Sequence, residues 1–380
     1  MQVVAIICMV LMSVYAALML LYRMGWERQP GFRLNSNYQP KTKISVVIPA
    51  RNEAERIGDC ISSILKQNYP MALLEVIVVD DHSDDNTEQM VNGFRNKQVR
   101  CISLATWLKE KEGIVAYKKE AIAAGIANSN GELIVTTDAD CTMEKNWLRQ
   151  LAGKYEVYKP VMIVAPVDFN VDQSFLDVFQ SLDFMTMQGI TAATHELKMG
   201  NMCNGANLAF TRAAYDAVGG YKGIDHMASG DDYLLMMKMQ KEFPGRIGYL
   251  KSQEAMVHTP PQPDLKGFLQ QRIRWASKSG KYDDKVMTLV LSFVYLFNLS
   301  LFALAICCFF SYMAILLSGA MLLIKIFAEM IFLFPVARFF GKQKQLVYFP
   351  FLQPFHIAYI VVAGFMGFIG VYKWKGRTVK

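Results

Sequence analysis

Acidic pairs follow two short apolar runs in the first half of the chain. Asp80 and Asp81 come directly after one run, and Asp138 and Asp140 form an Asp-x-Asp pair after another. In a turn just past a strand, two carboxylates can approach one divalent cation, although a lone Asp-x-Asp pair is more often a helix-capping turn. Capping needs only one carboxylate. The second member of the Asp80–Asp81 pair therefore predicts another role, such as accepting a hydrogen bond from a nucleobase imide.

A third acidic pair, Asp231 and Asp232, opens an apolar stretch in the second half of the chain. The dipole of a helix favours negative charge at its N-terminus, and Gly230 before the pair allows another group to approach closely. The pair is compatible with a helix N-cap, for which Asp231 is the candidate, and with a carboxylate that acts as a general base.

One segment carries three polar or aromatic residues at the spacing i, i+3 and i+4, namely Gln271, Arg274 and Trp275. This spacing places their side chains on one face of a helix. Apolar residues of the same segment cluster roughly 140° away, on another face. We therefore expect an interfacial amphipathic helix at 265–285, with one face on lipid and the other available to a site. The flanking basic residues suit anionic lipid headgroups, and they are Lys266, Arg272, Lys278 and Lys281.

The elements that would position the first two acidic pairs alternate between short β-branched runs and helical stretches. Continuous apolar strands separated by helices predict an α/β fold with a mostly parallel sheet that is covered on both faces. In such sheets ligands bind beyond the carboxyl ends of the strands, where these acidic pairs lie. The expected strands are 44–48, 76–79 and 133–136, and the expected helices are 53–67, 86–94 and 118–127.

The overall composition excludes several classes of protein. Of 380 residues, 53% are hydrophobic and only 19% are charged, which is too apolar for an ordinary soluble enzyme and incompatible with a disordered chain. The net charge of +7 does not form one patch, so no nucleic-acid partner is expected. Seven cysteines without C-x-x-C spacing indicate neither a disulfide framework nor a zinc knuckle.

The apolar excess lies at the two ends of the chain. The segment 1–22 has no charged residue and is long enough to cross a bilayer, so we expect an N-terminal transmembrane anchor. A basic linker, 23–43, follows, and the positive-inside rule then places the middle of the protein in the cytoplasm. About three further membrane segments are expected at 286–371, with a break near Ser311. Basic residues flank the last segment on both sides, so either this segment is re-entrant or interfacial, or the basic tail, 372–380, is an exception to the rule, and the side of the tail stays open.

Five ordered motifs together carry a resemblance that none of them carries alone. They are VVIPARNE at 46–53, VVDDHSDD at 78–85, DAD at 138–140, GDD at 230–232 and QRIRW at 271–275. In this order and at this spacing, the region from Ile44 to Tyr282 resembles the membrane-bound family 2 glycosyltransferases. The resemblance implies a GT-A fold at 44–264, a nucleotide-sugar donor that is most often a UDP-sugar, a divalent metal (Mg²⁺ or Mn²⁺), and inversion at the anomeric carbon.

The resemblance also implies a role for particular residues. It assigns Asp140 as the metal ligand and Asp232 as the catalytic base, where Asp231 precedes the base in place of the family's more frequent Glu. Lys118 matches a family lysine that faces the donor, although Lys119 beside it leaves that assignment open. The implied acceptor or lid residues are Asp231, Gln271 and Trp275, and the implied nucleotide- and donor-binding residues are Pro49, Ala50, Arg51, Glu53, Asp80, Asp81, Lys118, Asp138 and Arg274.

These observations predict a membrane-anchored, metal-dependent inverting glycosyltransferase. We expect it to transfer a sugar from a nucleotide-sugar donor to a lipid or lipid-linked glycan of the cell envelope, with the catalytic domain on the cytoplasmic face of the inner membrane. A processive polysaccharide synthase of the same family remains an alternative, because the Gln-x-x-Arg-Trp motif occurs in both kinds of enzyme. An inactive, membrane-tethered nucleotide-binding scaffold is a further alternative, against which the presence of every expected carboxylate argues.

Overall fold

The computed structural model describes residues 2–35, 37–109, 113–171, 174–200, 202–277, 284–369, 372–374 and 377–379 of the chain, with side chains between residues 5 and 369. These residues form two compact units, each described by itself. The sheet unit comprises Pro30–Asn170 and Met202–Pro260, and the helical unit comprises Met1–Gln29, Val171–Asn201 and Pro261–Lys380. Four basic residues of the predicted interfacial segment and tail lie outside the described residues, namely Lys278, Lys281, Lys375 and Lys380.

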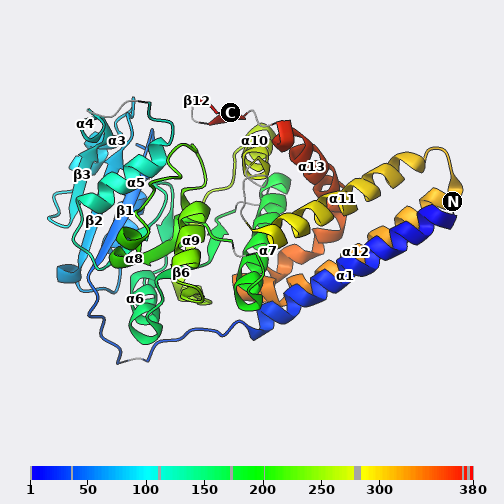
Figure 1. The fold of residues 1–380 in the computed structure, drawn as a ribbon, viewed down its shortest axis with the longest axis horizontal. Coiled ribbons are helices and arrows are strands. Elements are labelled where there is room, and N and C mark those ends of the chain that lie inside the picture. The colour runs from blue at the N-terminus through cyan, green and yellow to red at the C-terminus, as the bar shows by residue number, and fades with distance from the viewer. Residues whose placement is uncertain are drawn as a thin grey trace. The chain divides into compact units, whose positions relative to one another are not determined.

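Seven of the described strands form the main sheet, in the order β3-β2-β1-β4-β8-β6-β9 (Figure 1). The first four in this order pair in parallel, whereas β8 runs antiparallel to both β4 and β6. Nearly every residue of β1 and β2 is buried, which is why their sequences are continuously apolar. The predicted mostly parallel α/β fold is confirmed. The strands are β1 (Ile44–Ala50), β2 (Leu74–Asp80), β3 (Val99–Ser103), β4 (Leu133–Thr136), β6 (Met162–Val164), β8 (Leu208–Thr211) and β9 (Ile247–Tyr249).

Helices and a smaller sheet complete the sheet unit. The smaller sheet has the order β5-β10-β7, with β5 at Thr142–Met143, β7 at Val167–Phe169 and β10 at Val257–Thr259. The helices are α2 (Ile57–Leu65), α3 (Thr87–Asn92), α4 (Leu104–Trp107), α5 (Tyr117–Ala127), α6 (Trp147–Tyr158), α8 (Arg212–Ala217) and α9 (Asp231–Glu242), with single 3₁₀ turns at Met71–Leu73, Gly205–Asn207 and Gln253–Ala255.

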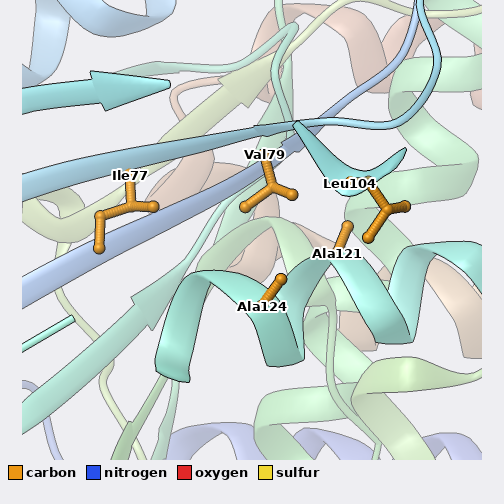
Figure 2. Packing of buried hydrophobic residues seen from close by; sticks show 5 residues of the cluster. All are labelled: Ile77, Val79, Leu104, Ala121 and Ala124. Carbon is orange, nitrogen blue, oxygen red and sulfur yellow. The ribbon is translucent and has the colours of Figure 1, made fainter. Parts of the chain in front are cut away.

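Helix α5 is the element that brings two lysines to the carboxyl edge of the sheet. Its Ala121 and Ala124 pack against Ile77 and Val79 of β2 in a fully buried cluster (Figure 2). At Gly125 the helix also lies so close to β1 that an added Cβ would come within 2.4 Å of a Val47 methyl group. Small residues on this face therefore allow the close contact between helix and sheet that fixes the N-terminal turn of α5.

The helical unit contains the apolar helices. α1 (Gln2–Arg28) packs along α12 (Tyr312–Phe340) and α7 (Phe175–Leu197), and α13 (Phe349–Ile369) packs against α10 (Leu265–Ala276) and α11 (Lys285–Cys307). The remaining elements of this unit are a 3₁₀ turn at Gln343–Val347 and the strands β11 (Tyr372–Trp374) and β12 (Arg377–Val379).

In the described part of the chain, four helical stretches are long and apolar enough to cross a membrane: Ala5–Arg28, Lys285–Cys307, Tyr312–Phe340 and Gln343–Ile369 (Figure 1). Transmembrane helices at both ends of the chain are therefore confirmed at the level of length and composition. The break between the second and third stretches falls at Ser311, which is the N-cap residue of α12, as the sequence predicted.

Residues 175–197 fall inside the domain expected at 44–264. In the structure they form α7, which packs with α1 and α12 in the helical unit. The apolar stripe of this helix, with Phe179 and Leu182 buried, is thus part of the core of the helical unit.

Candidate active site

The loops that follow β1, β2 and β4 meet at one edge of the main sheet. Ala50 and Asp80 are paired in register at the ends of β1 and β2, and the amide of Asp81 donates a hydrogen bond of 2.7 Å to the carbonyl of Ala50. β4 pairs with β1 in parallel on the other side, so the loop after Thr136 reaches the same edge. Parallel pairing therefore brings the three sequence motifs together at the place where ligands bind in such sheets.

The first two loops hold each other through Arg51 and Asp81. Nη1 of Arg51 donates a hydrogen bond of 3.0 Å to the carbonyl of Asp81 and lies 3.8 Å from its Oδ1. That same Oδ1 lies 2.9 Å from Nδ1 of His82. Asn52 and His82 both adopt a left-handed backbone conformation, with φ of 53°, which is uncommon for residues other than glycine. Two such residues in facing loops indicate a conformation that the surrounding contacts impose.

Asp80 carries a buried carboxylate oxygen that the described residues leave without a partner. Its Oδ2 accepts a hydrogen bond of 3.2 Å from the amide of Ser83, but its Oδ1 is buried and makes no hydrogen bond to any described group. Asp80 and Asp81 are only 7% and 4% exposed. An unpaired buried acceptor is costly, so Oδ1 of Asp80 is a position at which a bound donor group would be favourable.

The remaining predicted residues of the first motif lie at the end of β1 and in the turn that leads to α2. Pro49 and Ala50 belong to β1, and Ala50 is buried. The amide of Glu53 donates to Oγ1 of Thr87 at 2.8 Å, and its carbonyl accepts from the amide of Ile57, the first residue of α2. Glu53 thus fixes the turn into α2.

Lys118 links the Asp-x-Asp pair to the acidic pair at the start of α9. Its Nζ lies 2.8 Å from Oδ1 of Asp138 and 3.5 Å from Oδ2 of Asp231, and its side chain is 25% exposed. Burial by itself would lower the pKa of Lys118, but the carboxylates of Asp138, Asp231 and Asp232 raise it above the usual value. Lys118 is therefore a permanent cation among three carboxylates.

Asp232 has a fixed orientation. Its Oδ2 accepts a hydrogen bond of 3.0 Å from the amide of Gly205, and its Oδ1 accepts one of 2.7 Å from the amide of Tyr233. The expectation that Asp231 caps the helix is wrong, because Gly230, with a φ of 78°, is the N-cap residue of α9. A left-handed conformation at this position favours glycine, and Asp231 is thereby turned toward Lys118.

Asp140 lies in the turn that follows Asp138, where the carbonyl of Asp138 accepts from the amide of Cys141. Its Oδ1 accepts a weak hydrogen bond of 3.6 Å from Sγ of Cys141, and its Oδ2 is 4.0 Å from Nη1 of Arg56. Burial, and then the charge of Asp140, raises the pKa of Cys141 well above its usual value, so this thiol stays neutral and can donate.

The described residues contain no group of three or more His, Cys, Asp and Glu side chains that could hold a metal ion by themselves. A carboxylate oxygen is nevertheless the donor that Mg²⁺ and Mn²⁺ prefer, and cations of this kind are often bound by one or two carboxylates together with substrate phosphates. Asp140, whose side chain is 28% exposed, fits such a shared site and not an all-protein cage.

Lys119 has a function that the sequence did not reveal. It is 1% exposed, and its Nζ donates hydrogen bonds of 2.6 and 2.7 Å to the carbonyls of Ile224 and Met227. Lys238 of α9 donates to the carbonyls of Gly220 and Lys222 in the same loop. Two lysines therefore hold the loop 219–229 that leads into the pair at the start of α9. No motif could have shown this, because the acceptors are backbone carbonyls.

Gln271, Arg274 and Trp275 lie on α10, in the helical unit, so their positions are described within that unit. All three are partly exposed. Arg272 between them is 4% exposed and bonded to Asp183 of α7. The expectation that Arg272 faces anionic headgroups is therefore wrong: a buried carboxylate from another helix draws its guanidinium inward.

Comparison with known proteins identifies the family. The model for glycosyl transferase family 2 matches residues 45–218, and the model for glycosyl transferase family group 2 matches residues 133–365. The probable glycosyltransferase YdaM of Bacillus subtilis is 30% identical over 260 residues, which cover 67% of this chain and 59% of that protein. The 4,4'-diaponeurosporenoate glycosyltransferase of Staphylococcus aureus strain N315 is 24% identical over 52% of this chain and 53% of its own. The chain thus spans less than two thirds of the length of either relative.

A solved structure shares the fold over nearly the whole chain. It is the mannosyltransferase PcManGT of Pyrobaculum calidifontis in complex with GDP-Man and Mn²⁺, with a TM-score of 0.59, 19% sequence identity, and coverage of 96% of this chain and 98% of that one. At this identity the likeness concerns the fold alone, which is the GT-A fold that the motifs imply. Since the second family model covers more than half of the 380 residues, this chain belongs to glycosyl transferase family group 2, the family 2 glycosyltransferases.

Proposed function

We propose that this protein transfers a sugar from a nucleotide-sugar donor to a hydroxyl group of a membrane-associated acceptor, with inversion at the anomeric carbon. The observation that carries the proposal is the meeting of Asp138, Asp231 and Asp232 around Lys118 at the carboxyl edge of the sheet. Three carboxylates against one lysine leave an excess of negative charge, which would attract a divalent cation and suits a reaction in which a carboxylate removes a proton.

The nucleoside would bind between the loops that follow β1 and β2. The free oxygen of Asp80 can accept a hydrogen bond from a base imide or a ribose hydroxyl, and Asp81 is held beside it by Arg51. Uracil and guanine both offer an imide N–H, so a UDP-sugar is favoured by family membership and a GDP-sugar remains a competitor. The mannosyltransferase that shares the fold was solved with GDP-Man, so both UDP-sugars and GDP-sugars should be tested as donors.

Asp140 would hold a divalent cation together with the two donor phosphates. A cation in this position stabilises the charge that develops on the leaving nucleoside diphosphate. Asp138 would contact the ribose and the donor sugar, and its bond to Lys118 fixes the orientation of its carboxylate. Lys118 itself keeps Asp138 and Asp231 from repelling each other in the absence of substrate.

Asp232 would be the base that takes the proton from the acceptor hydroxyl. The amides of Gly205 and Tyr233 bind both of its oxygens, so the carboxylate has a defined orientation before substrate arrives. A base that is held in place does not lose rotational freedom in the reaction, which contributes to the rate. The family resemblance adds Gln271 and Trp275 as acceptor-binding residues and Arg274 as a residue that would bind the diphosphate.

The acceptor would be a lipid or a lipid-linked glycan, and the sheet unit would lie on the cytoplasmic face of the inner membrane. Four helices that are long and apolar enough to span a bilayer, among the described residues, support a membrane-associated acceptor. The basic residues after α1 support a cytoplasmic position for the sheet unit, by the positive-inside rule.

The test is transfer from a panel of UDP- and GDP-sugars with purified membranes, comparing the parent protein with Asp232→Asn. The substitution should lower turnover by about 1000-fold while nucleotide affinity stays within about threefold, because the base acts on the acceptor and not on the donor. Asp216→Asn, an exposed carboxylate of α8, is the matched control and should leave both unchanged.

The products distinguish the remaining alternatives. Single sugar additions support the proposal, and a long polymer would replace it by processive synthesis. Nucleotide binding without any transfer would support the scaffold alternative. Unchanged turnover in Asp232→Asn would remove Asp232 from the mechanism.

A further inference from the structure

A buried ion pair connects α10 to α7 in the helical unit. Both Arg272 and Asp183 have side chains that are 4% exposed, and Oδ2 of Asp183 accepts hydrogen bonds from Nε of Arg272 at 2.9 Å and from Nη2 at 2.6 Å. The other oxygen of Asp183 accepts a hydrogen bond from the hydroxyl of Tyr359 and lies 3.8 Å from Nε2 of His356, both on α13. Asp183 is therefore bonded on both of its oxygens.

Arg272 in turn contacts two of the three motif residues on α10. Its Nη1 donates a hydrogen bond of 2.7 Å to Oε1 of Gln271. Its guanidinium carbon lies 4.3 Å from the ring centroid of Trp275 and 4.7 Å from that of Phe268. The same guanidinium group thus fixes the amide of Gln271 and one face of the Trp275 ring.

This arrangement depends on Asp183. An arginine on an interfacial helix extends toward water or headgroups unless a partner holds it inside. A guanidinium that is buried without a charge partner is strongly unfavourable, so removal of the Asp183 charge would drive Arg272 outward. Gln271 would then lose its hydrogen bond, and Trp275 would lose the cation that lies over its ring.

We propose that Asp183 is a positioning residue for the acceptor side of the reaction: it holds Arg272, and Arg272 orients Gln271 and Trp275. This inference rests on the proposed function, in which Gln271 and Trp275 contact the acceptor. It gives α7, a helix without any motif residue, a specific part in substrate recognition. The carboxylate acts through Arg272 and touches neither donor nor acceptor.

The test compares Asp183→Asn with the parent protein in a transfer assay in which donor and acceptor are varied separately. Losing the charge should raise the KM for the acceptor by about tenfold and leave the KM for the donor within about twofold. Asp183→Glu keeps the charge and should restore the acceptor KM to within about threefold of the parent value. Should Asp183→Asn fail to fold, Arg272→Lys measures the same contact, because an ammonium group keeps the charge but cannot bind Asp183 and Gln271 and stack on Trp275 together.

The double variant Asp183→Asn/Trp275→Phe shows whether the carboxylate acts through the tryptophan. In the Trp275→Phe background, Asp183→Asn should add less than about threefold to the acceptor KM, because two changes in one chain of contacts are not additive. Independent, multiplying losses would overturn the proposal. Equal changes in the donor and acceptor KM values would also overturn it.

A matched control comes from a second buried carboxylate of the helical unit. Glu329 is 5% exposed and is bonded to Tyr15, Lys325 and Gln353, none of which is a motif residue of α10. Glu329→Gln should lower the temperature of unfolding without changing the ratio of the two KM values. If Glu329→Gln raises the acceptor KM as Asp183→Asn does, the effect belongs to general stability and the proposal fails.

A spectroscopic readout separates this proposal from the proposed function. The fluorescence difference between each protein and its Trp275→Phe counterpart reports the surroundings of Trp275 alone. Asp183→Asn should change this difference spectrum, and Glu329→Gln should not. A parent protein that transfers no sugar would refute the proposed function, whereas an unchanged spectrum in Asp183→Asn would refute the positioning role whatever the activity.

Discussion

Lys118 of the sheet unit and Lys325 of the helical unit both lie against acidic side chains, but the balance of charge around them differs. Lys118 is surrounded by Asp138, Asp231 and Asp232, so the cluster keeps a net negative charge, and the lysine side chain is 25% exposed. Lys325 is fully buried, and among the described residues its ion pair is with Glu329, 2.7 Å away, so this lysine and its carboxylate form a neutral pair.

The two clusters also differ in what their oxygens bind. In the helical unit, one oxygen of Glu329 accepts from Lys325 and from the Tyr15 hydroxyl, the other accepts from Nε2 of Gln353 at 2.9 Å, and Lys325 donates to Oε1 of Gln353. This cluster is neutral, both oxygens of Glu329 accept hydrogen bonds within it, and its bonds join α1, α12 and α13. The negative, partly open cluster of the sheet unit can take up a cation or a proton. The difference separates an arrangement that holds helices together from one that can do chemistry.

Of the substitutions at Lys118, Lys119 and Lys325, removal of the Lys118 charge should have the largest effect on activity. Without its ammonium group, Asp138 and Asp231 lose the cation that both of them contact, and the carboxylate that would contact the donor sugar loses the bond that orients it. Lys118→Met should therefore lower kcat/KM by about 100-fold or more in the transfer assay.

Two further variants make this test specific. Lys118→Arg keeps the charge and should recover part of the activity, and Lys66→Met, an exposed lysine after α2, should have no effect. Because the pKa of Lys118 is raised, the lysine stays protonated throughout the working range, and the pH profile of the parent enzyme should contain no step from this group. Activity within twofold of the parent in Lys118→Met would show that the negative cluster is not the reaction centre.

Lys119 allows a sharper comparison, because this neighbour of Lys118 on the same helix is buried and donates to two backbone carbonyls. Lys119→Met keeps most of the side-chain volume but leaves the carbonyls of Ile224 and Met227 without the ammonium group. The loop before Gly230 should become more mobile, so that Asp232, at the start of α9, is held less accurately. We therefore expect kcat to fall by about tenfold. Proteolysis of the loop 219–229 should become faster in the same variant. A loss as large as that of Lys118→Met would instead place Lys119 in the reaction itself.

The sequence predicted β1, β2 and β4 because their signals are local: each is a continuous β-branched run, and the predicted starts and ends differ from the observed ones by up to two residues. Parallel pairing of these three strands brings Asp80, Asp81 and the Asp-x-Asp pair to one edge. The sequence did not predict the other four strands of the main sheet, β3, β6, β8 and β9. The break near Ser311 was also predicted, because the apolar stretch at 286–334 is far longer than a single crossing of a bilayer needs.

The contacts that were missed connect residues far apart in sequence. Asp183 lies 89 positions before Arg272. Helical spacing compares only residues of the same helix, so it could not identify Asp183 as the partner of Arg272 and placed Arg272 among the basic residues that face headgroups. Lys118 and Lys119 could not be told apart from the sequence, because the distinction lies in what each ammonium group meets: carboxylates for one, backbone carbonyls for the other. Asp231 was only a candidate for the N-cap of α9, because aspartate is a preferred cap residue; the N-cap is Gly230, whose left-handed backbone conformation the sequence does not reveal.

Lys325 provides the smallest expected effect on activity and the clearest contrast with Lys118. Lys325→Met leaves Glu329 buried without its cation, which should lower the free energy of unfolding by about 3–5 kcal/mol, whereas turnover per folded molecule stays within about twofold. In the double variant Lys325→Met/Glu329→Gln no charge is left unpaired, and much of the lost stability should return. Thermal unfolding in detergent, with turnover measured on the folded fraction, checks both variants. If the double variant regains its stability but loses turnover, the charge of the helical cluster takes part in acceptor binding, and the separation of a structural cluster from a chemical one fails.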